Sequence, residues 1–136
     1  MDRSMAVLIV DDHQPMRRTI ADIMRSLGFD NLFYAEDGQM AWEKMQENAY
    51  DLILLDWNMP RLSGVELLQR IRMAEDEATP PLPVLMVTAE AEREQVVEAI
   101  KTGVTNYIVK PFAPATLERK LYEIFGKSEN EPEEQS

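Results

Sequence analysis

Five short apolar runs alternate along the chain with longer segments in which apolar residues recur at helical spacing. The runs cover about residues 5–10, 32–35, 51–56, 83–88 and 106–110. Each run has the length of a β-strand, and each intervening segment is long enough for a helix. The run DLILLD is continuously apolar between its two acids. That pattern is typical of a central parallel strand that helices cover on both faces.

The segments between and after these runs predict five helices. The first helix begins near Pro15, and the other four cover about residues 38–48, 63–74, 91–102 and 114–125. Pro15 suits a first turn, where a missing N–H removes no helical hydrogen bond, and Gly28 suits the position just after the first helix. The apolar stripes are Ile20, Ile23, Met24 and Leu27; Met40, Ala41 and Met45; Val65, Leu68 and Ile71; Val96, Val97 and Ile100; and Leu117, Leu121, Ile124 and Phe125. The segment EDEATPPLP (75–83) is predicted to be a loop.

Strands that alternate with helices at these lengths predict an α/β fold with a doubly wound parallel sheet and right-handed crossovers. One domain, residues 1–126, accounts for all the predicted elements. The last segment, residues 127–136, has four Glu against one Lys and no apolar residue. We expect it to be a disordered acidic tail.

Composition narrows the possible compartments and partners. The chain has 136 residues, 45% hydrophobic and 29% charged, as in an ordinary globular domain. It has no cysteine, which excludes disulfides and thiolate chemistry. No apolar stretch approaches the ~20 residues that span a bilayer, so we expect a cytoplasmic protein without membrane insertion. The net charge of −11 argues against direct binding of nucleic acid.

Polar side chains follow four of the predicted strands. Asp11 and Asp12 follow the first, Asp56 ends the third, Thr88 ends the fourth and Lys110 follows the fifth. The carboxyl ends of parallel strands lie at one rim of the sheet, where open α/β sheets bind ligands. Crowded carboxylates raise one another's pKa or recruit a cation, and Mg²⁺ is the natural choice for oxygen ligands. A carboxylate there can also attack phosphorus, and Lys110 and Thr88 suit the phosphoryl oxygens.

Each of these residues also has a simpler interpretation. Asp11 and Asp12 alone would be read as a turn that leads into a helix, and Lys110 alone as a surface lysine. Their joint placement at strand ends favours the site. His13 is a weak candidate for a metal ligand or phosphocarrier, because Mg²⁺ prefers oxygen. Trp57 is expected to be a partly exposed aromatic near the site.

The motifs LIVDDHQPMRR, LILLDWNMPRLSG, VLMVTAE and YIVKPF resemble those of receiver domains of two-component response regulators. The similarity is greatest to single-domain chemotaxis regulators, through AEDG, DWNMP, PVLMVTAEA and KPFxxATLExKLxxIF. It covers about residues 5–126. The resemblance implies a flavodoxin-like sheet of five strands in the order 2-1-3-4-5 with five helices.

The same resemblance implies a role for each acid. Asp56 would accept a phosphoryl group from a histidine kinase or a small phosphodonor. Asp12 and Asp56 would bind Mg²⁺ together with the backbone carbonyl of Asn58, and Asp11 would hold a metal-bound water.

The resemblance also implies a switch. Lys110 would pair with the phosphoryl group, and its peptide bond to Pro111 would be cis. Thr88 would move toward the phosphoryl group and Tyr107 would turn inward. These movements would reshape the face made by the fourth helix, the fifth strand and the fifth helix.

Two further positions, Asn58 and Glu90, match residues that influence hydrolysis of the aspartyl-phosphate in this family. We therefore expect self-dephosphorylation within seconds to minutes rather than hours. The protein would be a phosphoacceptor switch with intrinsic autophosphorylation and autodephosphorylation, not an enzyme with an external substrate.

The expected partners are a sensor histidine kinase, a downstream protein and a possible phosphatase. The downstream protein would be a motor-switch or relay protein, and Lys120 with the surface of residues 91–107 could contribute to its binding. Chemotaxis or motility signalling is the leading interpretation. A phosphorelay intermediate, or a regulator of another pathway, remains the alternative.

Three other classes of protein are less favoured. A haloacid-dehalogenase-type phosphatase needs a second Asp two residues after the nucleophile, where this chain has Asn58. A flavodoxin-like electron carrier needs a hydroxyl-rich loop after the first strand, where DDHQP would repel the phosphate of FMN. A degenerate receiver domain that serves only as a docking module would not need the acceptor Asp56, Thr88 and Lys110, all of which are present.

Overall fold

The predicted parallel sheet is confirmed by a computed structural model, which describes residues 1–59, 61–89 and 93–126. In these residues five parallel strands pair in the order β2-β1-β3-β4-β5. The strands are β1 (Val7–Val10), β2 (Leu32–Ala35), β3 (Leu52–Asp56), β4 (Val84–Thr88) and β5 (Asn106–Val109). The predictions about Glu90 and about residues 127–136 lie outside the described residues.

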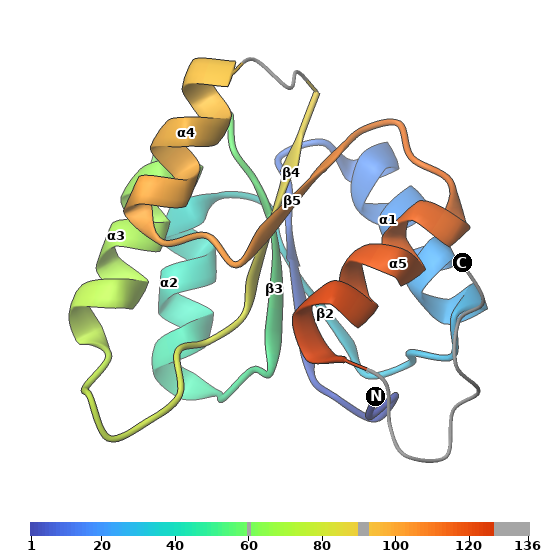
Figure 1. Ribbon diagram of the computed structural model, residues 1–136, viewed down its shortest axis with the longest axis horizontal. Helices are drawn as coiled ribbons and strands as arrows, with labels where there is room; N and C mark the ends of the chain where they lie inside the picture. The colour runs from blue at the N-terminus through green and yellow to red at the C-terminus, as the bar shows by residue number, and fades with distance from the viewer. Residues whose placement is uncertain (60, 90–92, 127–136) are drawn as a thin grey trace.

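Helices cover both faces of this sheet (Figure 1). They are α1 (Gln14–Ser26), α2 (Gly38–Glu47), α3 (Gly64–Ala74), α4 (Arg93–Thr102) and α5 (Pro114–Phe125). Helices α1 and α5 pack on one face, and α2, α3 and α4 lie on the other. No helix in the described part of the chain is long and apolar enough to cross a membrane.

The central strands β1, β3 and β4 are apolar up to their last residues because successive side chains enter two different cores. One core lies under α1 and α5 and contains Val7, Ile9, Leu52, Leu54, Leu85 and Val87. The other lies under α2, α3 and α4 and contains Leu8, Val10, Ile53, Leu55, Val84 and Met86. Alternate residues of one strand point to opposite faces, so a strand that is buried on both faces has no polar positions along it.

The end of α1 follows the sequence prediction. Gly28 has a φ of +98°, a conformation that residues with a Cβ rarely adopt. The amide of Gly28 donates to Arg25 O, and that of Phe29 donates to Met24 O, both at 3.0 Å. These bonds satisfy the last carbonyls of the helix and turn the chain toward β2.

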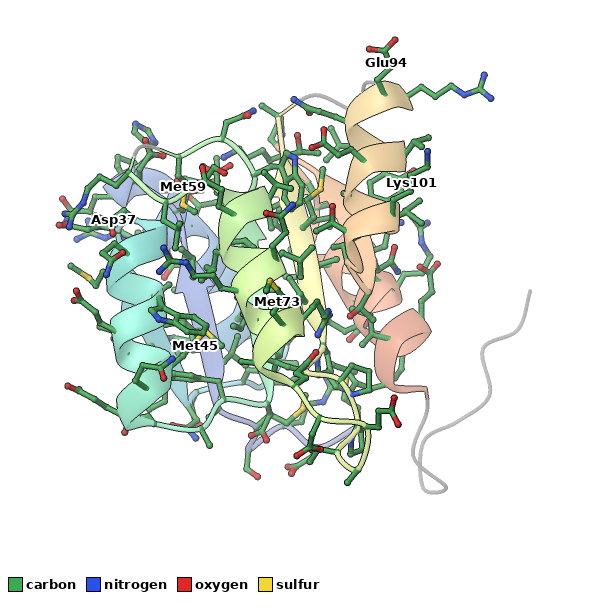
Figure 2. The ribbon with its side chains drawn as sticks, turned by 90° about the vertical axis from the view of Figure 1, so that its left-hand side faces the viewer. Asp37, Met45, Met59, Met73, Glu94 and Lys101 are labelled. Carbon is green, nitrogen blue, oxygen red and sulfur yellow. The ribbon has the colours of Figure 1, made fainter. Side chains whose placement is uncertain are left out.

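Helix α4 packs less deeply than its apolar stripe suggests. Within the described residues only Ala99 of this helix is buried, while Val97 and Ile100 are 40% and 58% exposed. The helix therefore approaches the sheet through its smallest apolar side chain. Met73 of α3 is 86% exposed beside it (Figure 2). Much apolar surface of α3 and α4 thus remains outside the core.

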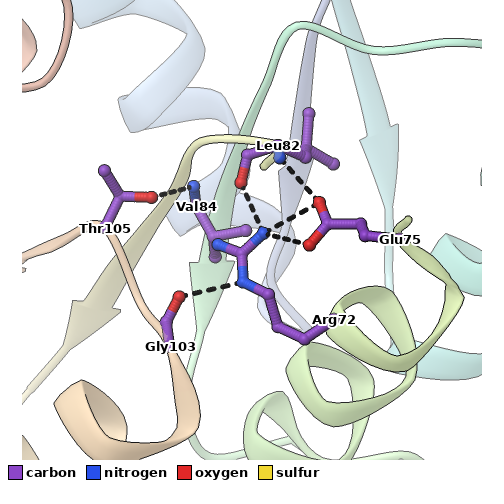
Figure 3. A network of polar contacts seen from close by, with 6 residues as sticks. All are labelled: Arg72, Glu75, Leu82, Val84, Gly103 and Thr105. Carbon is purple, nitrogen blue, oxygen red and sulfur yellow. Dashed lines mark hydrogen bonds and ion pairs between the residues drawn. The ribbon is translucent and has the colours of Figure 1, made fainter. Parts of the chain in front are cut away.

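The predicted loop between α3 and β4 is held in place by one arginine (Figure 3). Arg72 Nη1 lies 3.0 Å from both carboxylate oxygens of Glu75 and donates to Leu82 O at 2.8 Å. Its Nε donates to Gly103 O at 3.0 Å, and Glu75 Oε2 accepts from the amide of Leu82 at 2.7 Å. Arg72 and Glu75 therefore join the end of α3, the loop and the turn after α4.

Candidate functional site

The register of the sheet brings the predicted site residues to one rim. Val10 lies opposite Leu55, and Thr88 lies opposite Val109. Asp11, Asp56 and Lys110 therefore stand at the same edge as Thr88. The amide of Lys110 donates to Thr88 O at 2.8 Å, which continues the pairing of β4 and β5 past the end of β5.

Asp11, Asp12 and Asp56 form one acidic cluster. Each offers a carboxylate oxygen, and these three oxygens lie within 4.8 Å of one another. Asp11 and Asp56 are buried, at 1% and 5% exposure, whereas Asp12 is exposed. Such crowding of negative charge is costly unless a cation compensates for it.

Lys110 supplies part of that compensation. Its Nζ lies 3.2 Å from Asp11 Oδ2 and 3.5 Å from Asp56 Oδ1, and its side chain is only 14% exposed. The Lys110–Pro111 peptide bond is cis. The cluster has three carboxylates and only one neighbouring ammonium, so this rim of the sheet keeps a net negative charge that favours binding of a further cation.

Asp56 has the perturbed pKa expected of such a position. Burial raises the pKa of Asp56 from the usual 3.8 to about 6, and the negative charges of Asp11 and Asp12 act in the same direction. Lys110 and a hydrogen bond from the backbone N–H of Asn58 lower the pKa and limit the shift. The carboxyl is therefore ionised at pH 7 but easily protonated below pH 6.

Backbone contacts at the start of α1 hold Asp11. The amide of His13 donates to Asp11 Oδ1 at 2.9 Å, and Arg17 Nη1 donates to Asp11 O at 2.7 Å. His13 thus contributes its backbone here, and its imidazole is not among the atoms that contact the cluster in the described residues. The contact from Arg17 was not predicted, because nothing in the spacing of residues 11 and 17 marks it.

The turn after Asp56 packs tightly against α3. A Cβ at Gly64 would lie 2.7 Å from Asp56 O and 2.8 Å from Trp57 Cα, closer than side chains tolerate. Trp57 is buried, at 5% exposure, so the expectation that it is partly exposed is wrong. Its ring packs in the core under α2, α3 and α4 because the first turn of α3 closes over it. Gly64 is a residue whose importance the sequence did not indicate.

The predicted switch residues lie near this rim but differ in their surroundings. Thr88 is fully buried at the end of β4. Tyr107 is half-buried on β5, and Lys120 Nζ lies 4.7 Å from the centre of its ring. Asn58 is exposed two residues after Asp56. Tyr107 and Lys120 thus belong to the surface of β5 and α5 rather than to the acidic cluster.

The donor set of the cluster fits magnesium. Its side chains offer carboxylate oxygens and no sulfur or imidazole ligand. Mg²⁺ prefers one or two carboxylates and completes its shell with water or phosphate oxygens. The partly exposed setting leaves room for such ligands, because Asp12 and Asn58 are open to solvent.

Residues 7–122 match the family described as Response regulator receiver domain. The chain is 48% identical over 125 residues to chemotaxis protein CheY-3 of Vibrio cholerae serotype O1, a match that covers 92% of this chain and 95% of that protein. It is 46% identical over 121 residues to chemotaxis protein CheY of Pseudomonas aeruginosa, covering 89% of this chain and 96% of that protein.

Solved structures agree with these sequence matches. Chemotaxis response regulator CheY4 of Vibrio cholerae superposes with a TM-score of 0.79 at 33% identity, covering 89% of this chain and 98% of that chain. The receiver domain of sensor histidine kinase PA1611 from Pseudomonas aeruginosa PAO1 superposes with a TM-score of 0.78 at 29% identity, covering 91% and 99%. That structure has a magnesium ion coordinated in its active-site cleft.

Proposed function

The chain belongs to the response regulator receiver domain family, of the CheY type, and from that premise we propose that it is a stand-alone phosphorylation switch in chemotaxis signalling. Asp56 accepts the phosphoryl group, and a sensor histidine kinase or a small phosphodonor supplies it. The observation that carries this proposal is the placement of Asp56, a buried carboxylate 3.5 Å from Lys110 and clustered with Asp11 and Asp12. Receiver domains of this type are signalling switches rather than conventional enzymes.

The acidic cluster prepares the rim for a phosphoryl group. Asp12, Asp56 and the backbone carbonyl of Asn58 would hold Mg²⁺, and the carboxylate of Asp11 would support it. When bound, the metal supplies positive charge that offsets the carboxylates and the phosphoryl oxygens. Lys110 remains beside Asp56 and adds the charge of its ammonium.

Asp56 acts as the nucleophile in its ionised form. With a pKa of about 6 it is largely deprotonated at pH 7. One of its carboxylate oxygens forms a bond to phosphorus while the bond from phosphorus to an imidazole nitrogen of the kinase breaks. The electron pair of that bond stays on the imidazole, which then takes a proton from solvent. Lys110 stabilises the added charge through electrostatic attraction.

The output leaves through the face formed by α4, β5 and α5. A phosphoryl group adds about −1.5 to −2 charges and strong acceptor oxygens. The hydroxyl of Thr88, one residue beyond the position opposite Asp56 in the sheet, donates to those oxygens. Its displacement makes room for Tyr107 to turn inward, which alters the surface that Lys120 and the exposed Ile100 and Val109 present to a partner.

Several finer assignments belong to the same proposal. Residues 1–126 form the receiver domain, and residues 127–136 are an acidic tail. The location is the cytoplasm, where the sensor histidine kinase would phosphorylate it. Asn58 and Glu90 tune hydrolysis of the aspartyl-phosphate, with a phosphoryl lifetime of seconds to minutes. A phosphate-release assay that gave a lifetime of hours would contradict this last assignment.

Phosphorylation by a small phosphodonor tests the proposal directly. The purified protein is treated with acetyl phosphate and Mg²⁺, and the mass of the intact chain is measured. We expect one phosphoryl group on the wild type, none on Asp56→Asn, and an unchanged result for Asp30→Asn, an exposed acid far from the cluster in sequence. Equal labelling of Asp56→Asn, or no labelling of the wild type, would reject Asp56 as the acceptor.

The output surface needs a separate test. The wild type and Asp56→Asn are each used as bait for candidate partners, with and without beryllofluoride, an analogue of the phosphoryl group. A motor-switch component that is retained only by the activated wild type supports the chemotaxis assignment. Retention of a histidine-containing transfer protein instead supports the phosphorelay alternative. Identical retention under all conditions would contradict the switch.

A further inference from the structure

A small cavity lies between α1 and β2, next to the acidic cluster but separate from it. Its volume is about 330 Å³. The residues that line it are Gln14, Arg17, Arg18, Ala21 and Arg25 of α1 and Tyr34 of β2. The α1 residues recur at intervals of three, four and seven positions, which places them along one side of the helix. The cavity therefore follows the surface of α1 for about three turns.

The lining is rich in hydrogen-bond donors. It contains three guanidinium groups, a phenol and a side-chain amide, and no carboxylate among its described residues. The side chain of Arg18, which is exposed, makes no hydrogen bond or ion pair with any described residue. Arg25 Nη2 donates to Tyr34 Oη at 2.8 Å, so the hydroxyl proton of Tyr34 is available for another acceptor.

The remaining contacts of these arginines leave most of their donors available. Arg17 uses Nη1 for Asp11 O, at 2.7 Å. Arg25 lies 3.3 Å from Asp22 Oδ1, an exposed pair that contributes little. Each guanidinium has five N–H donors, so Arg17 and Arg25 retain several. Ala21 is 2% exposed, and its small side chain leaves space between the arginines.

The charge of this cavity is opposite in sign to the net charge of the chain. The chain carries a net charge of −11, which repels anions from most of its surface. Here three positive charges border one cavity. Planar guanidinium groups match the paired oxygens of phosphate, and a dianion balances this charge better than a single carboxylate does. The volume lies at the lower end of the range for small-molecule sites, which is about 300–1,000 Å³.

We propose that the cavity lined by Arg17, Arg18, Arg25 and Tyr34 binds a small phosphate-bearing anion. The anion contacts the guanidinium of Arg18 and the remaining donors of Arg17 and Arg25, and it accepts a hydrogen bond from the Tyr34 hydroxyl. This site is distinct from the phosphoacceptor: none of its lining residues belongs to the acidic cluster, and the two are linked by the contact of Arg17 with the backbone oxygen of Asp11. It takes anions without Mg²⁺ and without phosphoryl transfer.

Titration of the full chain with inorganic pyrophosphate in metal-free buffer tests the site. Without metal the acidic cluster repels the probe, so binding there does not interfere. Binding is followed by calorimetry and by NMR shifts of backbone amides and of arginine Nε–H groups. We expect saturable binding, with the largest shifts at residues 14–25 and at Tyr34.

Matched variants distinguish specific binding in this cavity from nonspecific electrostatic attraction to surface charges. Loss of one charge-assisted contact in Arg18→Gln should weaken binding by about tenfold or more. Arg18→Lys keeps the charge but not the planar guanidinium, so its affinity should lie between those of the wild type and Arg18→Gln. Arg119→Gln removes an equal charge from the exposed surface of α5 and should change affinity less than about twofold. Equal weakening by Arg18→Gln and Arg119→Gln, or no saturable binding, would overturn the proposal.

A second probe identifies the source of the phosphate. A short phosphoserine peptide is compared with pyrophosphate and with the same peptide lacking phosphate. Tighter binding of the phosphopeptide, lost in Arg18→Gln, indicates a phosphate carried by a protein. Binding of pyrophosphate alone indicates a free phosphorylated compound. Equal binding of the peptide with and without phosphate would overturn the proposal for peptides, because the phosphate would then contribute nothing.

Discussion

Asp56 combines burial with negative charge, two properties that oppose each other. Its side chain is almost excluded from water and lies beside two other carboxylates. Lys110 offsets only part of this cost, so the pKa of Asp56 stays near 6. The metal-free site therefore stores an electrostatic penalty that a bound cation would relieve.

This penalty predicts a dependence of stability on pH. Because the folded pKa lies above the usual 3.8, the folded protein holds its Asp56 proton more tightly than the unfolded chain. The penalty is absent below the unfolded pKa of 3.8, grows as pH rises through the folded pKa of about 6, and is complete by about pH 7, where it reaches about 2–3 kcal/mol. In metal-free buffer, Asp56→Asn should therefore be more stable than the wild type at pH 7.

Urea denaturation of both proteins from about pH 5 to about pH 8 measures the difference. The advantage of Asp56→Asn should grow by about 1 kcal/mol up to about pH 7 and then stay constant. Asp30→Asn is the matched control and should show no such trend, because Asp30 is exposed. A difference between wild type and Asp56→Asn that does not vary with pH would contradict the raised pKa.

At the scale of single elements, two adjacent residues at the start of α3 have different roles: one stabilises the helix and the other sets the distance between the helix and the acidic cluster. The hydroxyl of Ser63 caps the helix by accepting from the amide of Glu66 at 3.3 Å, whereas Gly64 lets the helix approach the backbone of Asp56. The two residues are adjacent, and the amide of Gly64 donates to Trp57 O at 3.2 Å, directly after Asp56.

Substitution at these two positions should have different consequences. Ser63→Ala should cost about 1 kcal/mol of stability and leave Mg²⁺ affinity unchanged. Gly64→Ala should cost about 1–3 kcal/mol and also weaken Mg²⁺ binding, because the new Cβ displaces the backbone of Asp56 and Trp57. Urea denaturation gives the first quantity and a Mg²⁺ titration of tryptophan fluorescence the second. Unchanged Mg²⁺ affinity in Gly64→Ala would show that the close contact does not position the site.

The elements differ in how far the sequence predicted them. The strands and the rim could be predicted, because a fully buried strand leaves an uninterrupted apolar run and its first polar residue marks its end. The exposure of Val97 and Ile100 could not, since helical spacing shows only that two residues share a side, not that the side is covered. The burial of Trp57 and the approach of Gly64 depend on the path of residues 57–63, which has no periodicity.

At the scale of the whole molecule, Arg72 connects segments that are distant in sequence. It contacts Glu75, Leu82 and Gly103, and thereby joins α3, the loop before β4 and the turn between α4 and β5 (Figure 3). Arg72 and Glu75 are 18% and 22% exposed, so their charges are only partly solvated. The sequence does not predict this network, because the prolines and charges of residues 75–83 indicate a loop but not which side chains hold it.

A double-mutant cycle tests the connection. Arg72→Met leaves Glu75 half-buried without its cation and should cost about 2 kcal/mol. Adding Glu75→Gln removes that isolated charge, so the double variant should be less destabilised than the sum of the single variants. Urea denaturation of the four proteins gives the coupling energy. The pair Arg119→Met and Glu123→Gln on α5, with atoms 4.0 Å apart at the exposed surface, should show almost no coupling.

Metal binding should also act on the whole molecule. Asp11 follows β1 and Asp56 ends β3, so the two meet only in the folded sheet, and we expect Mg²⁺ to bind the native state in preference to the unfolded chain. At about 100 times its dissociation constant it should stabilise the wild type by about 2.7 kcal/mol. Thermal denaturation with and without Mg²⁺ should show this shift, and Asp12→Asn should reduce it. An equal shift in Asp12→Asn would remove Asp12 from the metal ligands.

Because Lys110 follows β5, it becomes available late in the synthesis of the protein. Synthesis proceeds from the N-terminus, so β1, β3 and β4 leave the ribosome before Lys110 does. A nascent chain that has emerged as far as residue 109 contains all three carboxylates of the cluster and not the ammonium that partly offsets them. The acidic rim can close at low energetic cost only when the last strand and Lys110 arrive, or when a cation takes their place during translation.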